Sequence, residues 1–325
     1  MSLLSLRALN VRYAVTGPLK AMIAGLDSRF VNAVIDVSLD VENSTTLAIA
    51  GESGSGKSTL ARAITGLTPI ASGSVLFDGG NPFADGPRPA RSYHRHVAMM
   101  FQDPVSSLSP RRTVQSLIAE PFVIHGLKDK DLAAEVRRLL GLVGLPADFA
   151  SRYPHQLSGG QARRVGVARA IALNPRLIIA DEPTAGLDVS VQGEILNLLT
   201  RLQAELGLTY VIITHNLAVV RHVSDRTAIM YMGRVVEQGP TAAIFAGAAH
   251  PYTAALIESQ PNPDPARRRQ GPVLTGEVTS LRHRPTGCEF HPRCRQAAEK
   301  CRSDLPEDRN IATDHSLRCH FPLKG

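Results

Sequence analysis

The stretch GESGSGKST, residues 51–59, decides the fold of this 325-residue chain. It follows the pattern Gly-x-x-x-x-Gly-Lys-Ser, which is typical of a phosphate-binding loop. The short apolar run at 45–50 predicts a buried parallel strand, and the apolar residues at helical spacing in 58–67 predict a helix. Strand, glycine-rich loop and helix are the context that this motif requires.

The residue types of the loop suit the binding of phosphate. Glycine at positions 51, 54 and 56 lets the backbone curl, so that several N–H groups can point at phosphate oxygens. The following helix adds the partial positive charge of its N-terminus. Lys57 is placed to reach the terminal phosphates, and the Ser58 hydroxyl is a ligand for Mg²⁺. The alternative, a Gly/Ser-rich surface turn before a helix, does not account for the strand in front of it.

The composition is that of a globular protein, 43% hydrophobic and 20% charged. No apolar run approaches the roughly 20 residues that a membrane-spanning helix needs. The amino terminus lacks a long apolar core and a small-residue cleavage site, so we expect no secretory signal. The net charge is +7, but there is no Trp and aromatic residues make up only 5%. These numbers favour a mildly basic surface over a nucleic-acid groove.

The hydrophobic pattern predicts an α/β fold. Apolar and polar residues alternate over 9–13 and 31–41, which predicts antiparallel strands with one solvated face. After residue 176, strands and helices alternate, which predicts a mainly parallel sheet covered on both faces. The predicted domains are a catalytic core at 1–102 and 171–249, an inserted helical subdomain at 103–170, and a small C-terminal extension at 250–325.

Two further motifs complete the candidate site. The apolar strand at 177–180 ends in Asp181 and Glu182, a carboxylate to hold Mg²⁺ and a carboxylate to accept a proton from the attacking water. A solvated acidic turn is the alternative reading. The motif LSGGQ at 157–161 opens a predicted helix, where Ser158 and the backbone N–H groups form a second anion site. By itself LSGG would be an ordinary N-cap.

The order and spacing of these motifs, with Gln102 after a strand, AGLD at 185–188 and His215 in IITHN, resemble those of ABC-type ATPases. The resemblance covers about residues 1–250 and implies a P-loop NTPase fold of the ABC type. Tyr13 resembles the aromatic residue that stacks on adenine, although a strand aromatic packed on the core is an equal alternative. Two departures are Ala185-Gly186 and Glu42-Asn43-Ser44, where the family more often has Ser-Ala and a Gly.

The resemblance implies the following roles. The catalytic residues are Glu182, His215 and Gln102, and the Mg²⁺ ligands are Ser58, Gln102 and Asp181. The nucleotide contacts are Tyr13, Gly51, Ser53, Gly54, Ser55, Gly56, Lys57, Ser58, Thr59, Ser158, Gly159, Gly160, Gln161 and Asp188. Of these, the LSGGQ residues would face the ATP of an opposite subunit, and Asp188 would lie at the dimer seam.

The tail indicates the branch of the family. The segment HPYTAAL at 250–256, a Pro- and Arg-rich stretch at 260–272 and GCEFHPRC at 287–294 resemble the ATPase subunits of oligopeptide and dipeptide importers. The stretches QDP at 102–104 and SLSPR at 107–111 resemble the second member of the usual ATPase pair. The resemblance implies a second, non-identical ATPase, two transmembrane permease subunits, a solute-binding protein and a place at the cytoplasmic face of the cell membrane. Nickel-type importers and soluble ABC ATPases of phosphonate breakdown or nucleic-acid and translation roles are the alternatives.

All four cysteines lie in the tail, at Cys288, Cys294, Cys301 and Cys319. Four thiols on a short segment interrupted by prolines indicate a covalent or metal cross-link that stabilises the segment. In a cytosolic protein, bound metal is favoured over disulfides for this purpose. Relatives in the peptide-importer group carry an iron–sulfur cluster on such a tail, so the resemblance implies a [4Fe–4S] cluster on these thiolates. Structural Zn²⁺ and unliganded thiols are the alternatives.

Overall fold

The computed structural model describes residues 2–14, 30–103, 107–127, 131–260, 274, 276 and 280–323. Pro104 and the Pro- and Arg-rich stretch at 261–272 lie outside these residues. The chain divides into two compact units, which are described one at a time. Unit 1 consists of Met1–Leu4, Val41–Thr46 and Phe77–Ile213, and unit 2 of Ser5–Asp40, Leu47–Leu76 and Thr214–Gly325.

Unit 1 combines a parallel sheet with helices. Strands β5, β6 and β7 pair in parallel in the order β7-β6-β5. Every residue of β6 and β7 is buried, as expected for the near-continuous apolar runs of parallel strands covered on both faces. The elements are α3 Tyr93–His96, β5 Val97–Met100, α5 Val114–Ile124, α6 Leu132–Leu142, η1 Ala147–Ser151, η2 Pro154–Gln156, α7 Gly159–Ile171, β6 Leu177–Asp181, α8 Val189–Leu206 and β7 Thr209–Thr214.

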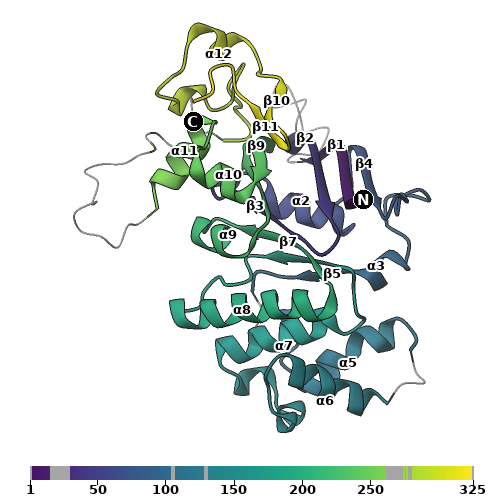
Figure 1. Ribbon diagram of the computed structural model, residues 1–325. Helices are drawn as coiled ribbons and strands as arrows, with labels where there is room; N and C mark the ends of the chain where they lie inside the picture. The colour runs from purple at the N-terminus through teal and green to yellow at the C-terminus, as the bar shows by residue number, and fades with distance from the viewer. Residues whose placement is uncertain are drawn as a thin grey trace, which may run out of the picture. The chain divides into compact units, whose positions relative to one another are not determined.

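Three helices of unit 1, α5, α6 and α7, pack side by side (Figure 1). Their shared core contains Leu117, Phe122, Leu139 and Val165, all with at most 1% of their surface exposed. Side-chain N-caps satisfy the first N–H groups of each helix, from Thr113 for α5, Asp131 for α6 and Ser158 for α7. This packing fixes the N-terminus of α7, where the LSGGQ motif lies.

Unit 2 contains a small sheet and a mixed sheet. Strands β1, β2 and β4 form the small sheet in the order β2-β1-β4. In the mixed sheet β3 is parallel to β8, while β8–β9, β9–β11 and β11–β10 are antiparallel pairs. The elements are β1 Ser2–Ala14, β2 Phe30–Glu42, β3 Thr46–Ala50, α2 Lys57–Ile64, β4 Ser72–Phe77, α9 Leu217–Val223, β8 Arg226–Tyr231, β9 Arg234–Pro240, α10 Thr241–Ala246, α11 Pro251–Glu258, η4 His291–Arg293, α12 Glu299–Ser303, β10 Asp308–Ala312 and β11 His315–Arg318.

The C-terminal part of unit 2 shares its core with the strand before the phosphate-binding loop. Tyr231, Tyr252 and Phe290 form an aromatic cluster with ring centroids 4.7 to 5.4 Å apart. The same core includes Ala48 and Ala50 of β3. The C-terminal segments, drawn in green and yellow in Figure 1, therefore share a hydrophobic core with the strand that supports the loop.

Across the described stretches of the chain, no helix combines the length and the apolar character that crossing a bilayer requires.

Candidate functional site

The predicted phosphate-binding loop joins β3 to α2 in unit 2. Gly51, Gly54 and Gly56 have φ of +148°, +81° and +103°, values that a side chain disfavours. A Cβ at Gly51 would lie 2.2 Å from the Met230 carbonyl oxygen, and one at Gly56 would lie 2.3 Å from that of Ala33. Glycine is therefore required at both positions by conformation and by close approach of backbone.

Lys57 lies at the first position of α2 and is buried. Its Nζ donates to the carbonyl oxygens of Gly51 and Glu52, both at 2.8 Å, and to Ser55 Oγ at 3.3 Å. The ammonium therefore lies inside the curl of the loop, where phosphate oxygens could replace these acceptors. Ser58 and Thr59 follow it, half-buried, at the N-terminal end of α2.

Two further predicted residues belong to unit 2. Tyr13 lies in β1 with 38% of its surface exposed, and its hydroxyl donates to Thr59 Oγ1 at 3.4 Å. The structure thus brings the predicted adenine-stacking residue to the end of the loop motif. His215 is exposed and directly follows β7, one residue before Asn216, the N-cap of α9.

The acidic pair lies in unit 1, at the carboxyl end of β6. Asp181 is the last residue of the strand and is buried, with 4% exposure. Glu182 is half-buried, has φ of +50°, and donates its N–H to the Ile213 carbonyl at 2.8 Å. This left-handed backbone turns the chain sharply out of the sheet at the carboxylate, which costs roughly 1–3 kcal/mol and is typical of functional sites.

The LSGGQ motif forms the N-terminus of α7, also in unit 1. Ser158 is the N-cap, and it forms a reciprocal capping box with Gln161. A Cβ at Gly160 would lie 2.8 Å from Val191 Cγ1 in α8, whose own N-cap is Asp188. The structure therefore brings the predicted signature residues beside the start of α8 and the predicted seam residue.

A residue that the sequence reasoning missed, Arg163, connects these motifs. It lies on α7 with 1% exposure and donates to the carbonyl oxygens of Gln102 at 3.1 Å and Ala185 at 3.0 Å. Burial lowers the pKa of its guanidinium. One side chain thus fixes the backbone at the predicted Gln102 and at the turn that follows Glu182. The only sequence signal was a charged residue two positions after the motif, on an otherwise apolar helix face.

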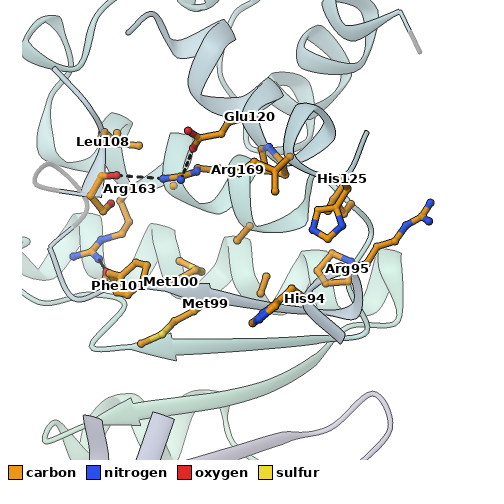
Figure 2. A pocket seen from close by; sticks show the side chains of 18 residues that line it. His94, Arg95, Met99, Met100, Phe101, Leu108, Glu120, His125, Arg163 and Arg169 are labelled. Atoms are coloured by element: carbon orange, nitrogen blue, oxygen red, sulfur yellow. Dashed lines mark hydrogen bonds and ion pairs between the residues drawn. The ribbon is translucent and has the colours of Figure 1, made fainter. Parts of the chain in front are cut away.

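An open cavity of about 290 Å³ in unit 1 is lined by Phe101, the residue before Gln102. Figure 2 shows Phe101, Met99 and Met100 of the β5 segment on one side, and Glu120 beside Arg169 on another. The carboxylate of Glu120 forms ion pairs with Arg112 and Arg169. Large apolar side chains stay exposed around the cavity, with Phe101 at 45% and Ile124 at 56%.

The four cysteines gather around one small cavity in unit 2, together with His250, His291 and His320. All four thiols are free. Burial raises the pKa of Cys288 to about 12 and that of Cys319 to about 11. Among the residues that the structure describes, no three His, Cys, Asp or Glu side chains form a group that could hold a metal ion. The donor atoms are of the type that a thiolate site uses, but within the described residues their arrangement does not support the predicted iron–sulfur or zinc site.

Comparison of the sequence with known proteins identifies the family of the chain. The family model described as "ABC transporter" matches residues 34–185, and the one described as "Oligopeptide/dipeptide transporter, C-terminal region" matches residues 236–301. A probable peptide ABC transporter ATP-binding protein of Sinorhizobium fredii is 47% identical over 294 residues, which cover 89% of this chain and 82% of that protein. The chain belongs to the ATP-binding proteins of ABC transporters.

Two other comparisons agree with this assignment. The dipeptide transport ATP-binding protein DppF of Haemophilus influenzae is 43% identical over 277 residues, which cover 85% of each chain. The solved dimer of the ATP-binding cassette MJ0796, in a post-hydrolysis state with ADP and phosphate, is 28% identical with a TM-score of 0.62, covering 73% of this chain and 98% of that one. The predicted α/β fold of the ABC type and the predicted ATP hydrolase activity are thus confirmed.

The predicted site residues of this ABC ATPase are divided between its two units. Unit 2 holds Tyr13, the phosphate-binding loop and His215, while unit 1 holds Gln102, the acidic pair, LSGGQ and Asp188.

Proposed function

We propose that this ABC ATPase hydrolyses ATP to energise the import of peptides or a related small solute across the cell membrane. The observation that carries the proposal is the match of residues 236–301 to the C-terminal region of oligopeptide/dipeptide transporters. Relatives over most of the chain are named peptide or dipeptide transport proteins, which supports the same solute class. The domain assignment follows: a catalytic core at 1–102 and 171–249, a helical subdomain at 103–170 and an importer-type extension at 250–325.

In the proposed reaction, the phosphate-binding loop and Lys57 hold the triphosphate, and Tyr13 stacks on adenine. Ser58, Gln102 and Asp181 would supply the hard oxygen ligands that Mg²⁺ prefers, and the bound ion would neutralise charge on the phosphates. Because phosphoryl transfer to water needs little covalent help, these residues act mainly by positioning and by charge stabilisation.

Glu182 would accept a proton from the attacking water. His215 would contact the terminal phosphate. Across a head-to-tail pair of chains, the Ser158 to Gln161 segment would close the opposite nucleotide, and Asp188 would lie at the seam. The exposed Ser158 and its capped helix N-terminus support this role, because they offer a hydroxyl and a positive helix end to an anion.

The cavity lined by Phe101 is proposed to receive a helix of a transmembrane permease subunit. Its support is local: Phe101 adjoins Gln102, and the exposed Phe101, Val123 and Ile124 offer an apolar surface to a partner. The complex would include a second ATPase, two permease subunits and a solute-binding protein, with this chain at the cytoplasmic face.

An affinity purification from detergent-solubilised membranes tests the importer assignment. We expect two polytopic membrane proteins and a second ATPase to co-purify with the wild-type chain. Ile124→Glu should lose the membrane proteins while keeping ATP binding, because it places a charge on the apolar docking surface. A stable complex without any membrane protein would favour the alternative of a soluble ABC ATPase.

We also propose that the four thiols take up a [4Fe–4S] cluster, with Zn²⁺ as the alternative. The support is the Cys₄ donor set around one cavity. The group would act as a structural staple, and it has no role in ATP chemistry. Protein prepared without oxygen should be brown with broad visible absorbance. A colourless protein with one equivalent of zinc would favour the alternative, and a metal-free protein would exclude both.

A further inference from the structure

The second residue of the phosphate-binding loop, Glu52, is held at three points in unit 2. Its N–H donates to the Tyr252 hydroxyl at 2.9 Å, and its carbonyl oxygen accepts from Lys57 Nζ at 2.8 Å. Its carboxylate accepts from both terminal nitrogens of Arg293, at 2.6 and 2.9 Å. Two of these three partners, Tyr252 and Arg293, come from the C-terminal region at 236–301.

Arg293 is built to hold Glu52 in one orientation. Its side chain is 5% exposed, and that of Glu52 is 23% exposed. The planar guanidinium meets the carboxylate with two parallel hydrogen bonds, which fix direction as well as distance. The hydrogen bond to Glu52 raises the pKa of Arg293, so the cation persists at any physiological pH. Its position on the chain is fixed by the short helix η4, next to Cys294.

The Tyr252 hydroxyl is fixed by packing. The residue lies in α11 and has no exposed surface. Its ring lies 4.7 Å from that of Tyr231 and 5.3 Å from that of Phe290, centroid to centroid. The oxygen that accepts the Glu52 N–H therefore cannot move without disturbing the aromatic cluster of the C-terminal region.

We infer that Arg293 and Tyr252 are positioning residues for the phosphate-binding loop, so that the C-terminal region helps to set the affinity for ATP. The inference rests on the proposed assignment of the loop to ATP. A loop with glycine at three positions has many accessible backbone conformations, and ordering it on binding would lower the affinity. The hydrogen bonds of Glu52 with Arg293 and Tyr252 restrict the backbone of the loop before ATP binds.

The test measures ATP affinity and loop order in the full-length chain. The variants are Arg293→Met, Glu52→Gln and the double variant, assayed with Mg²⁺ and a fluorescent ATP analogue. We expect each single variant to bind about tenfold more weakly, and the double variant to bind about as weakly as either single one, because both remove the same contact. Hydrogen exchange at the loop amides, measured without nucleotide, should speed up in all three.

Arg318→Met is the matched control. Arg318 is also a mostly buried arginine of the C-terminal part, and it pairs at 2.8 Å with a carboxylate outside that part, Asp36 of β2. Arg318 does not belong to the phosphate-binding loop. The ATP affinity of the Arg318→Met variant should therefore stay within twofold of that of the wild type. Urea unfolding midpoints of all variants separate loss of loop order from loss of fold.

Three results would overturn the inference: single variants within twofold of wild type, losses that add up to about a hundredfold in the double variant, or unchanged exchange at the loop amides. If Arg293→Met does not fold, Tyr252→Phe removes one hydroxyl from a retained core, and it should bind ATP about threefold more weakly. An unchanged affinity in a folded Tyr252→Phe would then count against the inference. If the wild-type chain fails to bind the analogue, the ATP assignment is wrong, while loop exchange still decides whether Arg293 orders the loop.

Discussion

Replacing Arg163 with Met should separate ATP binding from ATP hydrolysis. The change keeps an unbranched side chain in the buried site on α7 and removes the donors to the Gln102 and Ala185 carbonyls. A carbonyl that loses its donor in a buried setting costs roughly 1–3 kcal/mol. Two effects offset part of this cost. Met buries no charge, and the substitution removes the Arg163 Nε, which has no hydrogen-bond partner within the described residues. A net loss of about 3 kcal/mol in the free energy of unfolding is expected.

The effect on hydrolysis should be larger than this loss of stability implies. Gln102 and the turn after Glu182 would no longer be fixed to one side chain, and a displacement of about 1 Å in a catalytic group costs on the order of a hundredfold in rate. ATP binding should fall less than hydrolysis, because the acceptors of Arg163 are at Gln102 and Ala185 of unit 1, whereas Lys57 and the phosphate-binding loop belong to unit 2.

The assay compares steady-state ATP hydrolysis, affinity for a fluorescent ATP analogue and urea unfolding. The matched control is the adjacent Arg164→Met, which removes a hydrogen bond to the Val143 carbonyl and a surface ion pair with Glu194. It should keep hydrolysis within twofold of wild type. The reasoning would be refuted by an Arg163→Met protein that is less stable as expected but hydrolyses ATP at the wild-type rate.

The remaining predictions concern the acidic turn, the loop and the C-terminal core. Glu182→Gln should retain ATP binding and lose at least a hundredfold in hydrolysis, measured by phosphate release; wild-type turnover would remove Glu182 from its proposed role. Gly51→Ala should abolish ATP binding, because its Cβ would meet the Met230 carbonyl at 2.2 Å, whereas Gly54→Ala meets no atom within 4 Å and should be milder in the same binding assay. Glu237→Ala should lower the free energy of unfolding in urea by about 3–5 kcal/mol, since a fully buried carboxylate that accepts three hydrogen bonds is lost; a change below about 1 kcal/mol would contradict this.

The regular elements were predictable wherever local signals mark their ends. Strands and helices are predicted to alternate after residue 176, and β6, α8, β7 and α9 follow one another there. The N-caps Asp188 and Asn216 and the left-handed Gly207 are short-range signals that a sequence displays directly. The loop, the acidic pair and LSGGQ were recognisable for the same reason, because each is a contiguous motif.

The contacts that organise the site were not predictable, because they join distant parts of the chain. Arg163 reaches Gln102 across 61 residues, and Arg293 reaches Glu52 across 241. The strand β10 was missed because all five of its residues are exposed, so no apolar alternation marks it; its pairing with β11 creates it. Tertiary pairing of this kind overrides weak local preference.

The hairpin of β10 and β11 also has a consequence for how the chain avoids self-association. β11 pairs with β9 in the register Ser316 to Gln238 and Leu317 to Glu237, so it covers the backbone hydrogen-bonding groups along that side of β9. A chain ending after α10 would leave this edge open, and an open edge is a template for a strand of another molecule. We expect such a shortened chain to aggregate, even though its ATP-binding motifs are all present. The β10–β11 hairpin thus protects the backbone of β9 from pairing with another molecule.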